Sequence, residues 1–260
     1  MYFKKLIHPE LYQGYRKKDK YFEGWYYKLV SFDEHTTLAF IPGISKNKKD
    51  PHAFIQVFIS KSNAQDAHLS RYYFKFPSRD FSYTHDAFSV RIGKNFFSKE
   101  KIEIDLKNEQ IYIYGVVEIQ QITPIKKSIL APNIMGPFGY LNFMECYHGI
   151  VSMHHMLLGA LNINQDKINF TEGKGYIEKD WGKSFPRAYV WLQSNHFKNE
   201  QTSLMFSFAD IPFLGFYFKG LIANLYLNGK EYRFATYNFT KVVKEDIRGL
   251  SVHYQLKKGK

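Results

Sequence analysis

The chain has 260 residues, of which 45% are hydrophobic and 18% aromatic, so it is long enough to bury one large core or two smaller ones. Its formal net charge of +12 is compatible with an anionic surface or a nucleic acid as partner. Lys greatly outnumbers Arg, however, and specific base recognition depends on the forked guanidinium of Arg. We therefore attribute the charge to composition and expect no nucleic-acid partner.

The single cysteine, Cys146, excludes an intramolecular disulfide bond and a cysteine-based zinc site. The first residues lack the apolar run of a signal peptide, and no 18 consecutive apolar residues occur anywhere in the chain. These features fit a reducing compartment, and we expect a cytoplasmic location.

Short apolar and aromatic runs, separated by Gly, Pro, Asn and Asp, recur along the chain. Several alternate with a period of two, as Ile102, Ile104 and Leu106 do with charged residues, which is typical of half-buried strands. Asn228 and Gly229 between two such runs predict a tight hairpin. No helix of ordinary length is predicted, so we expect an all-β fold of antiparallel strands. The expected strands cover residues 21–32, 37–42, 52–60, 72–76, 87–92, 101–106, 111–120, 145–158, 167–177, 188–195, 203–209, 216–227, 230–237 and 249–256.

Residues 122–140 interrupt this pattern with Pro124, Pro132 and Pro137, two glycines and a pair of lysines. Such a composition is typical of a connection between two β units.

Residues 173–182 carry an unusual density of charge around two aromatic residues. On a strand, Tyr176, Glu178 and Asp180 share one face. If that face is enclosed, the two carboxyls repel each other and one is driven toward its neutral form, which suits a general acid. The alternative is a face in water on which both carboxyls are ionised.

Residues 21–28 place Tyr21, Glu23, Trp25 and Tyr27 on one face of a strand. A carboxylate within an aromatic row is unusual for a core strand, which makes Glu23 a further candidate acid. The alternative is a tyrosine-rich wall in which Glu23 pairs with a Lys or Arg.

Residues 144–159 are rich in histidine. His154 and His155 are adjacent and so point to opposite faces of a strand, which argues against a metal site. A Cys146–His148 nucleophile pair lacks a third group to orient it. The chain also lacks the motifs of nucleotide-binding loops, serine hydrolases and zinc proteases. We expect neither a metal nor a cofactor.

Four blocks together resemble the tocopherol cyclase-like family: HPELYQG (8–14), YFEGWYYKL (21–29), MECYHGIVSMHH (144–155) and GKGYIEKDWGKSFP (173–186), the last followed by WLQSN (191–195). The family is similar in architecture to carotenoid 1,2-hydratases. The resemblance implies two tandem lipocalin-like antiparallel β-barrels, residues 1–130 and 131–260. Family members carry further strands beyond this point, so the expectation allows for a second barrel that is incomplete at its C-terminus.

The resemblance also implies a chemistry. An alkene of a prenyl tail is protonated, and the tertiary cation is captured by an internal phenol or by water, without cofactor or metal. The implied partner is a lipophilic small molecule such as a prenylated aromatic compound. Peripheral contact with a membrane is a further expectation, and the oligomeric state is left open.

We rank Asp180 first as the acid, because Gly182 lets the backbone turn sharply beside it and hold its short side chain. Glu178 is the close rival and Glu23 the third candidate. The acid is expected to be largely buried with a raised pKa. A non-catalytic binder of an apolar ligand is the alternative function. The expected ligand-contacting residues are Trp25, Tyr27, Tyr176, Trp181, Glu145 and His148.

Overall fold

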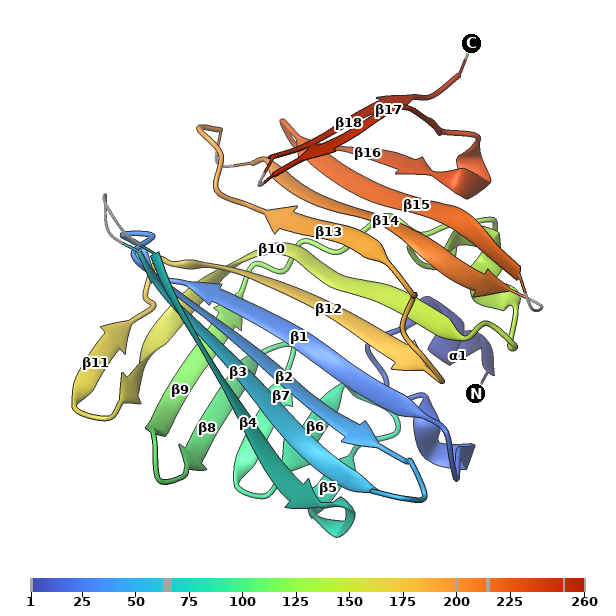
Figure 1. The fold of residues 1–260 in the computed structure, drawn as a ribbon. Coiled ribbons are helices and arrows are strands. Elements are labelled where there is room, and N and C mark those ends of the chain that lie inside the picture. The colour runs from blue at the N-terminus through green and yellow to red at the C-terminus, as the bar shows by residue number, and fades with distance from the viewer. Residues whose placement is uncertain (1, 63–66, 200, 214–215, 250, 260) are drawn as a thin grey trace.

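The computed structural model describes residues 2–62, 67–199, 201–213, 216–249 and 251–259 (Figure 1). The prediction of an all-β, antiparallel fold is confirmed, and the hairpin at Asn228–Gly229 joins two paired strands. Within the described ranges the helices are all short: α1 (Tyr2–Ile7) and the 3-10 turns η1 (Gly14–Arg16), η2 (Ser78–Asp80), η3 (Gly136–Tyr140) and η4 (Thr236–Asn238). None of these helices has the length and hydrophobicity required to cross a membrane.

The larger layer is a 12-stranded sheet in the order β4-β3-β2-β1-β12-β10-β9-β8-β7-β6-β5, with β11 paired to β10. The sheet curves strongly, so that β3 and β4 come to lie over the same interior as β6 and β7 (Figure 1). No hydrogen-bonded pairing joins the end strands β4 and β5 in the part of the chain that the structure describes. Its strands are β1 (Phe22–Val30), β2 (Thr36–Ser45), β3 (His52–Ser62), β4 (Ala67–Pro77), β5 (Phe81–Tyr83), β6 (Ser89–Ile92), β7 (Asn95–Ser98), β8 (Lys101–Lys107), β9 (Tyr112–Gln120), β10 (Cys146–Ile163), β11 (Asp166–Asn169) and β12 (Lys174–Gly182).

This sheet does not end at the expected boundary between residues 130 and 131. Strand β10 pairs with β9 through its C-terminal half and with β12 through most of its length, and β12 pairs with β1. The proline-rich stretch therefore connects two neighbouring strands of one sheet. Strand β10 has 18 residues, long enough to hold both partners, and its register shifts absorb the resulting bend.

A second, four-stranded sheet lies over the outer face of β1, β12 and β10 (Figure 1). It consists of β13 (Tyr189–Ser194), β14 (Ser203–Phe213), β15 (Phe216–Leu227) and β16 (Lys230–Ala235). A separate hairpin, β17 (Lys241–Arg248) and β18 (Ser251–Lys257), packs against it through Val242, Tyr254 and Leu256.

The buried apolar side chains form three clusters, the smallest of them within the second sheet and against the β17–β18 hairpin. The interior of the main sheet is filled by buried aromatic and aliphatic side chains, including Trp25, Tyr27 and Phe40. A smaller core between the two sheets contains Met153 and Tyr176. The interior of the main sheet is filled by side chains, and a pocket opens between the two sheets.

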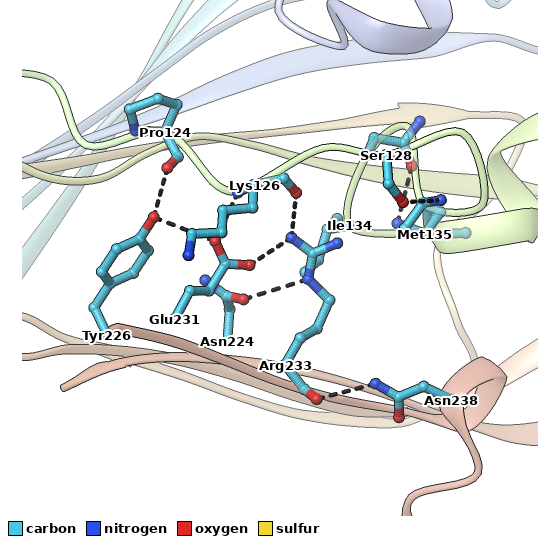
Figure 2. Close-up of polar contacts among 12 residues, drawn as sticks. Pro124, Lys126, Ser128, Ile134, Met135, Asn224, Tyr226, Glu231, Arg233 and Asn238 are labelled. Atoms are coloured by element: carbon cyan, nitrogen blue, oxygen red, sulfur yellow. Dashed lines mark hydrogen bonds and ion pairs between the residues drawn. The ribbon is translucent and has the colours of Figure 1, made fainter. Parts of the chain in front are cut away.

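The connection from β9 to β10 is fixed to the second sheet by a buried ion pair (Figure 2). The Glu231 carboxylate accepts the Lys126 backbone N–H at 2.6 Å and the Tyr226 hydroxyl at 3.2 Å. Arg233 pairs with Glu231 at 2.5 Å and donates to the Lys126 carbonyl at 2.6 Å. Each charged group is thus satisfied, which lets the pair be buried without an unpaired charge.

Candidate active site between the two sheets

Strand β12 places its alternate side chains on opposite sides of the main sheet. Tyr176, Glu178 and Asp180 face the second sheet, as the spacing predicts, whereas Ile177 belongs to the interior core. Opposite β12 on β10, His148 is in register with Asp180. We call Tyr176, Glu178, Asp180 and His148 the acid cluster.

Glu178 Oε2 has three polar neighbours, two in the acid cluster and one on the second sheet. The Tyr176 hydroxyl donates to it at 2.5 Å, the Trp191 indole N–H donates at 3.2 Å, and His148 Nε2 lies 3.5 Å away. His148 Nδ1 donates to Asp180 Oδ1 at 2.8 Å. The imidazole therefore stands between two carboxyls, with one at each nitrogen.

Burial dominates the ionisation of Glu178, whose residue is only 5% exposed. Desolvation, with a smaller contribution from the charge of Asp180, raises the pKa of Glu178 to about 7, although His148 and the two hydrogen bonds oppose the rise. Desolvation lowers the pKa of His148, but the two carboxyls outweigh it and raise that pKa to about 9. At neutral pH the cluster thus contains an imidazolium, and the Glu178 carboxyl keeps its proton to a higher pH than a carboxyl in water does.

Three members of the acid cluster, His148, Glu178 and Asp180, line one wall of a cavity of about 440 Å³ between the sheets. Apart from the cluster, the walls are mainly aromatic and aliphatic, with glycines and alanine making room where the strands approach each other. This is the concave, largely apolar setting typical of a small-molecule site. The lining includes Phe22, Gly24, Tyr26, Phe54, Phe58, Met135, Phe138, Cys146, Tyr189, Trp191, Ala209, Ile211, Phe218, Gly220 and Leu221. We call it the inter-sheet pocket.

Of the two rival carboxyls, Glu178 is the one that matches the expected environment. The side chain of Asp180 remains 30% exposed and that of Glu178 only 6%. The shorter Asp180 side chain ends at the rim of the cluster, because Gly182 and the strand end come immediately after it. The burial expected of the acid is thus found at Glu178 and not at Asp180, which the sequence analysis ranks first.

Glu23 is not part of the acid cluster. It is fully buried on the opposite side of the sheet, where its Oε1 lies 2.5 Å from Lys179 Nζ. The backbone N–H groups of Gln13 and Gly14 and the hydroxyl of Tyr21 also donate to it. This is the pairing described by the alternative interpretation of residues 21–28, and it ties the N-terminal segment to β1.

The other expected ligand-contacting residues are also separated from the acid cluster. Trp25 and Tyr27 are fully buried in the interior of the main sheet, where they donate to backbone carbonyls. Trp181 stacks on Tyr147 with ring centroids 5.4 Å apart, and Glu145 accepts a hydrogen bond from Ser184. For Trp25, Tyr27 and Trp181 the period of two explains the separation, since these strand positions alternate with those that face the pocket, whereas Glu145 precedes β10.

One group of described residues offers several possible ligands for a cation. His148, Glu178 and Asp180 offer ligand atoms that all lie within 4.8 Å of one another. His148 Nδ1 is hydrogen-bonded to Asp180, whereas Nε2 is buried without a hydrogen bond, 3.5 Å from Glu178 Oε2. The same three side chains can share protons among themselves as a coupled group.

Two aromatic residues of the site are not among the site residues that the sequence predicts. Tyr26 and Trp191 lie edge to face at a centroid distance of 5.5 Å, and both line the inter-sheet pocket. Tyr26 lies between two positions assigned to the other face, and Trp191 comes from the second sheet. Both belong to the recognised blocks, YFEGWYYKL and WLQSN, which is the signal that points to them.

The fold and the acid cluster define an all-β protein with a buried carboxyl in an apolar pocket between two antiparallel sheets. The model of the family described as tocopherol cyclase-like matches residues 126–238, which confirms the resemblance for a segment that includes β10, β12 and the second sheet. No curated protein matches the chain.

Two solved structures share the fold. One is a protein provisionally assigned as AttH from Nitrosomonas europaea, with a TM-score of 0.51 and 14% identity, covering 92% of this chain and 77% of its own. The other is kievitone hydratase from Nectria haematococca, with a TM-score of 0.51 and 11% identity, covering 95% of this chain and 77% of its own. At these identities the likeness concerns the fold alone.

Proposed function

We propose that this protein protonates an alkene of a lipophilic small molecule and so promotes its cyclisation or hydration, with Glu178 as the proton donor. The observation that carries the proposal is Glu178 itself, a buried carboxyl with a pKa raised to about 7 at the wall of an apolar pocket. The tocopherol cyclase-like match and the hydratase among the fold neighbours support this reaction class.

In the proposed reaction, the Glu178 carboxyl transfers its proton to the less substituted alkene carbon. The tertiary cation that forms is captured by a hydroxyl of the substrate or by water, and the released proton restores Glu178. Tyr176, Trp191 and His148 all contact Glu178 through Oε2, so in this proposal Oε1 carries the transferable proton. The rings of Tyr26 and Trp191 line the pocket and suit stabilisation of a passing cation.

His148 and Asp180 have a supporting role in this proposal. The more exposed Asp180 connects the cluster to solvent, and the imidazolium of His148 lies between it and Glu178. Protons can therefore return to Glu178 along Asp180 and His148 after each turnover. The imidazolium also stabilises the Glu178 carboxylate that remains after the alkene is protonated.

Incubation of the purified protein with a prenylated hydroquinone in D₂O tests the reaction. The expected product is a chromanol or a tertiary alcohol that carries one deuterium at the carbon next to the new C–O bond, and Glu178→Gln is expected to abolish it. Unchanged substrate across a panel of prenylated phenols, with the wild-type fold intact, would contradict the proposal.

The second candidate is a non-catalytic binder of an apolar ligand in the same pocket. Three contacts on Oε2, from Tyr176, Trp191 and His148, stabilise the ionised form of Glu178. A proton donor must instead be in its neutral form, so these contacts favour a binding role. Native mass spectrometry separates the two. A lipid that remains chemically unchanged after prolonged incubation indicates binding. A gain in mass of roughly 18 Da, from one added water, or a new isomer in the extract indicates catalysis.

A further inference from the structure

A loop tip in the connection between β9 and β10 exposes two consecutive aliphatic residues. Ile129 is 87% exposed and Leu130 is 78% exposed. The turn that presents them is closed by reciprocal backbone hydrogen bonds between Ser128 and Ala131, at 3.0 and 3.1 Å. Two large aliphatic side chains held outward by a closed turn are not explained by packing within the chain.

This tip is fixed from both sides. On one side the buried Glu231–Arg233 pair binds both backbone groups of Lys126 (Figure 2). On the other side, the Asn133 side chain donates to the carbonyl of Leu6 at 3.0 Å. The tip is thus presented on a rigid base, which lowers the entropy that a binding partner must remove.

The same contacts bring helix α1 beside the tip. Lys127 Nζ also donates to the carbonyl of Ile7. Ile7 is 43% exposed and Phe3, one turn earlier on the same face, is 73% exposed. The exposed apolar side chains of Phe3, Ile7, Ile129 and Leu130 form what we call the apolar tip.

Basic residues surround the apolar tip. Lys126 and Lys127 precede it directly, and Lys4 lies on α1. Nearby acids are already engaged, since Glu231 pairs with Arg233 and Asp86 pairs with Lys4. The pair with Asp86 neutralises Lys4. Burial lowers the pKa of Lys127, and the charge of Glu10, which pairs with Lys99, opposes that fall. Among the described residues, neither Lys126 nor Lys127 forms an ion pair, so these two lysines supply the positive charge next to the exposed aliphatic residues.

We propose that the apolar tip docks the protein on an anionic bilayer surface, with Ile129 and Leu130 inserted below the headgroups and Lys126 and Lys127 among them. Apolar side chains flanked by lysines are typical of interfacial anchors. A stable protein interface needs roughly 1,200 Å² or more of buried surface, more than the four side chains of the apolar tip supply. Met135 and Phe138, a few residues further along the same connection, line the inter-sheet pocket.

Co-sedimentation of the full chain with vesicles tests this proposal. We expect binding to vesicles of 70% phosphatidylcholine and 30% phosphatidylglycerol, with weaker binding to pure phosphatidylcholine. The double variant Ile129→Ser, Leu130→Ser is expected to lower the partition coefficient by about tenfold or more. Lys126→Gln with Lys127→Gln is expected to weaken only the preference for the anionic vesicles.

The matched control is Val243→Ser with Val252→Ser, two exposed aliphatic residues of the β17–β18 hairpin, which is expected to bind as wild type does. Circular dichroism checks that each variant is folded. Absence of wild-type binding, equal binding by the Ile129/Leu130 variant, or a change of that variant from dimer to monomer in light scattering would each overturn the proposal. Vesicle binding is measured without turnover, so its outcome is independent of the proposed reaction.

Discussion

Glu178 and Lys179 are consecutive residues of β12, yet their charged ends lie on opposite sides of the main sheet. Glu178 lines the inter-sheet pocket, and Lys179 pairs with Glu23 in the interior at 2.5 Å. Lys179 also donates to the carbonyls of Pro9 and Leu11, both at 2.7 Å. The strand thus supplies the candidate acid from one face and the anchor of the N-terminal segment from the other.

Removal of the anchor is expected to destabilise the fold. Lys179→Met leaves the Glu23 carboxylate buried without its counter-ion, and the free energy of unfolding in urea should fall by about 3–5 kcal/mol. The double variant Glu23→Gln, Lys179→Met removes both charges and should recover part of that loss. A double variant less stable than Lys179→Met alone would contradict the ion-pair explanation.

Glu178→Gln keeps the size of the side chain and removes the transferable proton. We expect turnover of any identified substrate to fall by about 10²–10⁴-fold, the usual contribution of a general acid. Asp180→Asn, which changes a residue at the rim of the cluster, should reduce turnover less. The ranking would be wrong if Asp180→Asn were the more damaging of the two at saturating substrate.

The pH dependence of turnover follows from the sign of the Glu178 shift. A proton donor must be protonated before it acts, and its pKa is raised to about 7. The rate should therefore be constant at lower pH and fall about tenfold per unit as the pH rises above about 7. A rate that increases through this range would assign Glu178 the role of a base.

Trp191→Phe is expected to shift the pH above which the rate of turnover falls. The indole N–H stabilises the Glu178 carboxylate and so lowers the pKa of Glu178. Its loss should raise the pKa and shift the falling limb of the pH profile to higher pH. Trp191→Leu, which also removes the ring, is the comparison: it should shift the limb similarly but lower the maximal rate more if the aromatic face stabilises a cation.

His148 should make stability pH-dependent. Its pKa in the folded protein is about 9, above the ordinary value of 6.5, so the folded state holds this proton more tightly than the unfolded state. The stabilisation is fully present below pH 6.5 and is lost as the pH rises through 9. The stability difference between wild type and His148→Gln should shrink by about 1–3 kcal/mol over this range in urea titrations. A difference that grows with pH would contradict the assigned protonation.

The alternation of residues along the sequence determined a large part of this protein. It predicted the antiparallel strands, the hairpin at Asn228–Gly229, and the common face of Tyr176, Glu178 and Asp180, because a strand directs every second side chain to the same side. The four recognised blocks contained the residues of the acid cluster together with Tyr26 and Trp191.

Only the tertiary structure decided which face lines the pocket and which carboxyl is buried. Glu23 and Glu178 both lie in aromatic strand segments, but one meets a buried lysine and the other an imidazole and an indole from distant strands. Periodicity carries no information about these partners. The pairing of β12 with both β1 and β10, and the second sheet that covers them, brings the groups together and excludes water from Glu178, which raises its pKa.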